Sequence, residues 1–321
     1  MNLQNTTIYT KNIHHLGDNI FCCILFCKIK EYIEQNNILI IHYCLTEHIN
    51  QITEFINSKN IKIVSIEELS QLSNNIKVYD LWMGSSDYEY NYYYEYINSP
   101  DNINLEYDMF LCKFYNNILN ILNIPIEINK FTFDGKDLPD IAQNINNKTN
   151  NKYNNIDVLF INGTPLSGQF TYNLEEWNNV IKLFSEKYNV VTTQKVDGVK
   201  CTREDNLSAK DISAISTNVK KIIAIDSGVS IGLYNDITLN NVEMIYYLCS
   251  TGVCMCSFPK FIHATNLNEI LFLLNSDKKI ETMQNIENNY NYNVINILIY
   301  LIGLTSCLLY YNKYKKWFYK K

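Results

Sequence analysis

Apolar positions along the first half of the chain alternate between short β-rich runs and longer amphipathic stretches. Strands are predicted over residues 7–13, 38–44 and 61–66, with helices over 20–35 and 47–57 between them. This β-α-β-α-β order implies parallel strands that are joined by right-handed crossovers.

A second series of the same kind starts near residue 157. Its strands are predicted over 157–162, 189–193, 221–226 and 242–248, and its helices over 174–187 and 208–217. We therefore expect an α/β fold with two Rossmann-like domains that face a cleft. The Asn- and Lys-rich stretch 134–155 separates the two series, which gives an N-terminal domain 1–145 and a C-terminal domain 146–278.

The end of the chain has a different pattern. Residues 294–311 carry no charge for 18 positions, and lysines and aromatic residues follow at once. Such a helix is roughly 27 Å long, close to the thickness of a bilayer core. We predict a polar linker 279–293, a transmembrane helix 294–311 and a basic tail 312–321; the alternative is a buried C-terminal helix.

Composition narrows the function classes. The net charge of −6 and the presence of a single arginine, Arg203, argue against nucleic acid as a partner. The abundance of Asn, Ile, Lys and Tyr indicates an AT-rich genome, for which a virus is one candidate source.

Cysteines in the apolar run FCCILFC are expected to pack as small hydrophobic residues. With no secretory signal visible, we expect a reduced, cytosolic main body that associates with a membrane through the C-terminal anchor.

Three turns at predicted strand ends are candidates for chemistry, because ligands bind at the carboxyl ends of such strands. The first is HHLGDNIF, where Gly17 permits a tight turn and Asp18 lies near a helix N-terminus. Asp18 is either an N-cap or a carboxylate base that faces the cleft. His14 and His15 flank this turn, with a role in acceptor binding or in the loop alone.

The second turn is INGTPLSGQF, in which Thr164, Ser167 and Gly168 suit the close approach of a phosphate. It contains neither a Walker sequence nor GxGxxG, and an ordinary loop is the alternative. The third is IIAIDSG, where Asp226, Ser227 and Gly228 precede a helical turn. An anion can bind there, and Asp226 either accepts from a sugar hydroxyl or caps the helix.

The order of these turns resembles the family 9 glycosyltransferases, which are ADP-heptosyltransferase-like enzymes with the GT-B fold. The motifs HLGDN, NGT followed by Trp177, and AIDSG carry this resemblance. It implies that Asp18 is the catalytic base. It also implies two groups of binding residues: Thr164, Ser167, Gly168, Asp226, Ser227 and Gly228 on the donor side, and His14, His15, Gly17 and Asn19 on the acceptor side.

The chain departs from the family pattern at two places. The family usually has a His three positions after the Gly of D-[ST]-G, whereas this chain has Ile231. The family's phosphate loop typically carries a Lys, which is missing here, and Lys195 is a candidate replacement from the next strand end.

On this resemblance we expect a metal-independent, inverting glycosyltransferase without a cofactor. It would move a sugar from a nucleotide-sugar donor to a glycan or lipid-linked acceptor. No Asp-x-Asp sequence occurs, which argues against a metal-dependent transferase, and no metal site is expected. The alternatives are a non-catalytic binding or scaffold protein that keeps a degenerate fold, and a nucleotide-sugar epimerase or hydrolase.

Overall fold

The computed structural model describes residues 3–85, 87–88, 107–137, 152–166, 168, 170–249 and 260–271. The chain divides into two compact units, Met1–Leu267 and Asn268–Lys321, and both sheets belong to the first unit. Within the described ranges, no helix is long and apolar enough to cross a membrane. The predicted linker, transmembrane helix and tail, and the predicted domain boundary at 145/146, lie outside those ranges.

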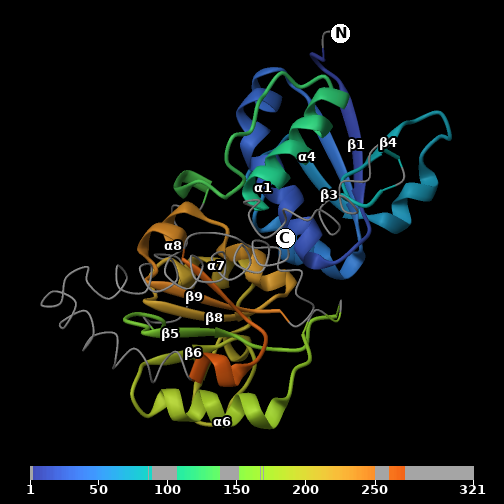
Figure 1. Cartoon of the computed structure of the whole chain (residues 1–321). Coiled ribbons are helices and arrows are strands. Elements are labelled where there is room, and N and C mark those ends of the chain that lie inside the picture. The colour runs from blue at the N-terminus through green and yellow to red at the C-terminus, as the bar shows by residue number, and fades with distance from the viewer. Residues whose placement is uncertain are drawn as a thin grey trace, which may run out of the picture. The chain divides into compact units, whose positions relative to one another are not determined.

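The first sheet has four parallel strands, seen in blue to cyan in Figure 1. β1 (Thr7–Asn12) pairs with β2 (Leu39–Cys44) and with β4 (Val78–Asp80), and β2 pairs with β3 (Ile61–Ser65). The three predicted strands are confirmed. β4 was not predicted, because its three residues are too few to show a pattern.

The helices of this half are α1 (Leu16–Gln35), η1 (Thr46–His48), α2 (Ile49–Thr53), η2 (Ile66–Gln71) and α4 (Tyr107–Ile121). The predicted start of the first helix at residue 20 is wrong, because α1 begins at Leu16 with His15 as its N-cap. The Asp18 carboxylate accepts from the His15 amide at 3.2 Å, as in a capping box. Asp18 therefore lies in the first turn of the helix, at the third position after the cap.

The second sheet has six parallel strands in the order β10-β9-β8-β5-β6-β7. Counted from β5, this is the doubly wound order 3-2-1-4-5-6, so the chain reverses direction across the sheet between β5 and β8. Figure 1 shows β9, β8, β5 and β6 side by side in that order. The strands are β5 (Val158–Ile161), β6 (Val190–Thr192), β7 (Lys200–Cys201), β8 (Lys221–Ile225), β9 (Met244–Leu248) and β10 (Phe261–Ala264).

Short helices connect these strands. They are α6 (Leu174–Ser185), η4 (Arg203–Asp205), α7 (Ala209–Ser216), η5 (Gly228–Leu233) and α8 (Asp236–Asn241), while η3 (Gly135–Asp137) precedes the sheet. The predicted strands and helices of this half are confirmed, with ends that differ by at most two residues. The two-residue β7 and the strand β10 were not predicted.

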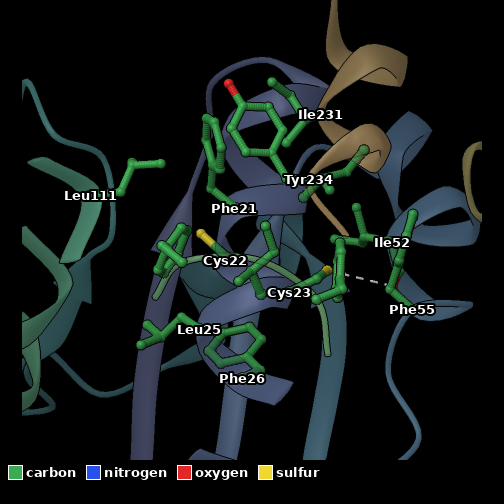
Figure 2. Close-up of a cluster of buried hydrophobic side chains, with 14 of the residues drawn as sticks. Phe21, Cys22, Cys23, Leu25, Phe26, Ile52, Phe55, Leu111, Ile231 and Tyr234 are labelled. Atoms are coloured by element: carbon green, nitrogen blue, oxygen red, sulfur yellow. Dashed lines mark hydrogen bonds between the residues drawn. The ribbon is translucent and has the colours of Figure 1, made fainter. Parts of the chain in front are cut away.

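A shared apolar core joins α1 to η5 in the first unit. Phe21 of α1 packs edge-on against Tyr234, with ring centroids 5.7 Å apart, and Figure 2 shows Ile231 beside this pair. Cys22 and Cys23 are buried in the same cluster, and Cys23 donates to the Ile52 carbonyl. Burial raises the pKa of both thiols. These cysteines are free, as the packing prediction required.

Candidate functional site

A cavity of about 530 Å³ opens at the carboxyl ends of β5, β6 and β8, where the doubly wound order places a ligand. Its size lies in the range of pockets that hold small molecules. The residues that line it are Leu16, Gln51, Ile161, Asn162, Gly163, Thr164, Thr193, Gln194, Thr202, Arg203, Asn206, Leu207, Ala209, Ile212, Ser227 and Val229.

The buried side chain of Asn162 ties the end of β5 to the end of β6. Its Oδ1 accepts from the amides of Thr193 at 3.0 Å and Gln194 at 2.9 Å, while Thr193 Oγ1 donates to the Asn162 carbonyl at 2.9 Å. Gly163 follows with φ +145°, and a β-carbon there would lie 3.2 Å from Gln194 Cγ. Only glycine therefore fits this turn without strain, and the two strand ends are held in a fixed relation.

The second predicted turn is divided between the cavity and its surroundings. Thr164 is exposed and lines the cavity. Gly168 is exposed with φ +73° and does not line it. Ser167 lies outside the described residues. The structure thus brings Thr164 to the site and leaves Gly168 apart from it.

Asp226, which directly follows β8, does not line the cavity. Its side chain is buried, and its Oδ1 accepts from the Tyr247 hydroxyl at 2.6 Å. Its Oδ2 has no hydrogen-bond partner among the described residues. Burial raises the pKa of this carboxyl to about 7, against the opposing effect of the Tyr247 hydrogen bond. The sequence predicts that Asp226 contacts a ligand directly. In the structure its side chain instead binds Tyr247 and lies outside the cavity lining.

A short hydrogen-bond chain connects Asp226 to the loop above it. Tyr247 Oη also lies 2.9 Å from Ser230 Oγ, and Ser230 Oγ accepts from the Ser227 amide at 3.1 Å. Ser227 lines the cavity. Through Tyr247 and Ser230, the buried carboxyl thus determines where Ser227 lies.

The N-terminus of α1 packs directly against this loop. A β-carbon on Gly228 would lie 2.9 Å from both the Gly17 nitrogen and Leu16 Cβ. Leu16 and Val229 both line the cavity. Gly17 and Gly228 are consequently packing residues that allow the close approach, and neither lines the cavity.

Asp18 lies two residues after Leu16 in the same helix turn, and it does not itself line the cavity. Burial raises its pKa, and the nearby charges of His14 and His15 partly oppose that rise. A raised pKa makes the ionised carboxylate a stronger base. Its carboxylate accepts a hydrogen bond from the His15 amide in the same turn.

The other predicted acceptor-side residues differ in their placement. His14 stacks on Trp82, with ring centroids 3.7 Å apart, and His15 is exposed. Asn19 points into the interior: its Oδ1 lies 3.2 Å from His42 Nε2, and its Nδ2 donates to the His15 carbonyl. The acceptor-side assignment of Asn19 is therefore wrong, because its side chain is fully buried.

The basic residue at the cavity is not the one that was predicted. Lys195, the candidate replacement for the family's lysine, pairs with Glu204 at 3.4 Å and does not line the cavity. Arg203 lines it instead, although no motif singled it out. Its being the only arginine in the chain was the one signal available.

Ile231 occupies the place where the resemblance expects a histidine. It is buried, and its Cγ1 lies 3.2 Å from the position of a β-carbon on Gly17. The side chain thus fills the contact between α1 and η5. In the part of the chain that the structure describes, no group of three or more His, Cys, Asp or Glu side chains is placed to hold a metal ion.

No protein-family model matches the chain, and no curated protein sequence matches it. By contrast, solved structures do match the chain. The E. coli heptosyltransferase WaaC with ADP-2-deoxy-2-fluoro heptose matches with a TM-score of 0.51 at 8% identity, over 84% of this chain and 99% of that chain. WaaC with ADP matches with a TM-score of 0.50 at 9% identity, with the same shares of the two chains.

A glycosyltransferase of family 9 from Veillonella parvula DSM 2008 has a TM-score of 0.48 at 13% identity, over 86% of this chain and 90% of that chain. The similarity to WaaC shows that the fold is that of the GT-B glycosyltransferases. The fold predicted from the sequence is confirmed to this extent.

Proposed function

We propose that the protein is a glycosyltransferase that moves a sugar from a nucleotide-sugar donor to a hydroxyl group of an acceptor. One observation carries the proposal. The cavity lies where a doubly wound sheet binds its ligand, and the helix turn that carries a carboxylate of raised pKa packs against the cavity's rim. The fold shared with WaaC, whose structures contain ADP and an ADP-sugar, supports this class of donor.

On the donor side, the nucleoside diphosphate would occupy the cavity. The hydroxyl groups of Thr164 and Ser227 line it and can donate to phosphate oxygens. Asp226 holds the Ser227 loop through Tyr247 and does not itself contact the donor. Fixed donors of this kind stabilise charge that develops on a leaving group.

On the acceptor side, Asp18 would act as the general base. Its carboxylate takes the proton of the acceptor hydroxyl as the oxygen forms a bond to the anomeric carbon. The bond from that carbon to the phosphate oxygen breaks, and the nucleoside diphosphate leaves with its electron pair. Attack from the face opposite the leaving group inverts the configuration. His14, held against Trp82, and His15 would bind the acceptor beside Asp18.

The proposal includes independence from metal ions. The absence of an Asp-x-Asp sequence supports it, because metal-dependent transferases of the other main fold use that pair of carboxylates. The hydroxyl groups of Thr164 and Ser227 and the positive charge of Arg203 would stabilise the diphosphate in place of a metal ion. Unchanged turnover in excess EDTA would support this part, and recovery only on addition of Mg²⁺ or Mn²⁺ would overturn it.

We also propose that residues 294–311 anchor the enzyme to a membrane, with its main body in the cytosol. The acceptor would be a glycan or a lipid-linked molecule. The uncharged run and the lysines after it support the anchor. Membrane fractionation of the full chain, compared with a chain ending at residue 278, tests it directly.

The test of the activity is a transfer assay on Asp18→Asn, with Asp197→Asn as a control. Asp197 is exposed and does not line the cavity, so Asp197→Asn removes the same charge without changing a lining residue. We expect Asp18→Asn to lower kcat by about a hundredfold or more, in line with the loss of a general base, and Asp197→Asn to leave it unchanged. Full activity in a folded Asp18→Asn variant would contradict the proposal. The anomeric configuration of the product, read by NMR, tests inversion.

A second candidate function is nucleotide-sugar binding without transfer. Ile231, which fills a position where the resemblance expects a histidine, is the observation that favours it. Donor binding without consumption of the donor, across a panel of acceptors, would establish this alternative.

A further inference from the structure

The helical turn η4 consists of three charged residues, Arg203, Glu204 and Asp205, of which Arg203 lines the cavity. The three side chains differ in whether they have a partner of opposite charge. Glu204 pairs with Lys195 at 3.4 Å. Asp205 pairs with Lys152 at 2.7 Å and also accepts from Tyr153 Oη. Both acids are therefore neutralised by lysines outside the cavity lining.

Arg203 has no acidic partner among the described residues. Its Nη1 donates a hydrogen bond to Gln194 Oε1 at 2.6 Å, so the other N–H groups of the guanidinium remain available for a ligand. It is also the sole charged side chain among the described residues that line the cavity. The other polar lining groups are amides and hydroxyls. The cavity thus presents one uncompensated positive charge to whatever enters it.

The contacts that hold the ends of β5 and β6 together also position the guanidinium of Arg203. Gln194, which accepts from Arg203, has its own amide fixed by Asn162 Oδ1 at 2.9 Å. The Gln194 side chain also lies against Gly163, where a β-carbon would come within 3.2 Å of its Cγ. Arg203 is therefore tied to the ends of β5 and β6 although it lies on the surface. A positioned donor loses less entropy on binding than a free side chain.

We propose that Arg203 binds the diphosphate oxygens of the donor, in place of Lys195. This assignment rests on the proposed function, since it names the residue that recognises the anionic part of the same donor. A guanidinium suits the role because its planar N–H groups pair with two phosphate oxygens at once. The site therefore distinguishes nucleoside diphosphates from the matching nucleosides mainly through one residue.

The experiment measures the affinity of the full-length protein for ADP, UDP and GDP, and for adenosine, uridine and guanosine, by titration calorimetry. The variants are Arg203→Gln, Arg203→Lys and the matched control Lys195→Gln, which removes a neighbouring positive charge outside the lining. For the diphosphate that binds wild type, Arg203→Gln should weaken binding by about tenfold to a hundredfold, the usual worth of a charge-assisted hydrogen bond. The diphosphate affinity of Arg203→Lys should lie between those of wild type and Arg203→Gln, because lysine keeps the positive charge but cannot pair with two phosphate oxygens at once.

Two further readouts separate recognition from damage to the fold. Arg203→Gln should leave the affinity for the nucleoside unchanged and make diphosphate binding less sensitive to salt, while Lys195→Gln should change both affinities by less than about threefold. An equal loss for nucleoside and diphosphate would overturn the assignment, as would unchanged diphosphate affinity in Arg203→Gln. In the second case the proposed function stands and only the role of Arg203 falls. Failure of wild type to bind any of the three diphosphates would overturn both.

Discussion

Gly17 in the first turn of α1 and Gly228 at the start of η5 touch backbone to backbone. A β-carbon on Gly228 would lie 2.9 Å from the Gly17 nitrogen, and one on Gly17 would lie 3.3 Å from the Gly228 α-carbon. One residue beyond Gly17 is the proposed base, Asp18, and one residue before Gly228 is the cavity residue Ser227. This contact therefore sets the distance between the proposed acceptor and donor sides.

Replacing Gly228 with alanine should damage stability and transfer together. The added methyl group meets backbone atoms, so the helix turn must shift, at a cost of about 1–3 kcal/mol in unfolding free energy. Gly135→Ala is the matched control, since its β-carbon would find only ordinary contacts at 3.5 Å with Ile237. Denaturant unfolding and transfer rates of both variants check this. Equal effects of the two substitutions would show that the contact is unimportant.

Asp226 should make the protein less stable as pH rises. Its pKa is about 7 in the folded protein against an ordinary 3.8, so the folded state holds a proton that the unfolded chain has lost. The stabilising effect of this proton is full below about pH 4 and disappears as pH rises through 7. At about 1.4 kcal/mol per pKa unit, the loss is on the order of 4 kcal/mol.

The measurement is the unfolding free energy of wild type and Asp226→Asn at several pH values between 4 and 8. The difference between wild type and the variant should shift in favour of the variant across this range, because asparagine has no proton to lose. A difference that stays constant with pH would mean that Asp226 is ionised in the folded state throughout.

His42 should behave in the opposite way. Burial lowers its pKa to about 3, and its ring nitrogens contact Thr10 and Asn19. Because the unfolded chain binds the proton first, this residue adds stability as pH rises from about 3 to 6.5. NMR of the imidazole nitrogens should show a neutral ring from pH 8 down to about 4.5. A titration midpoint near 6 would refute this account of the buried ring.

The sheets could be predicted from the sequence because their strands are buried runs such as VLFI and KIIAI, whose apolar character is unmistakable. The two-residue β7 and three-residue β4 carry no comparable signal. The start of α1 was misjudged because histidine is an uncommon N-cap, whereas Asp18 is the partner that closes the capping box.

The candidate site was predictable only in outline. Short turns indicated which strand ends matter, and Thr164 and Ser227 do line the cavity. Burial decides the rest, and burial depends on contacts between distant segments: Asn19 faces His42, and Asp226 faces Tyr247. Arg203 could not be distinguished from Lys195 without the pairing of Lys195 with Glu204.

The most direct test of the central claim is nucleotide-sugar binding by two tryptophan variants from one loop. Thr164→Trp would fill the cavity, whereas Leu166, which is 93% exposed, lies outside the lining and makes Leu166→Trp the control. In a calorimetric screen of nucleotide sugars with the full-length protein, wild type and Leu166→Trp should bind one donor class with equal affinity, and a folded Thr164→Trp should lose it. Undiminished binding by Thr164→Trp, or no binding by a folded wild type, would contradict the account.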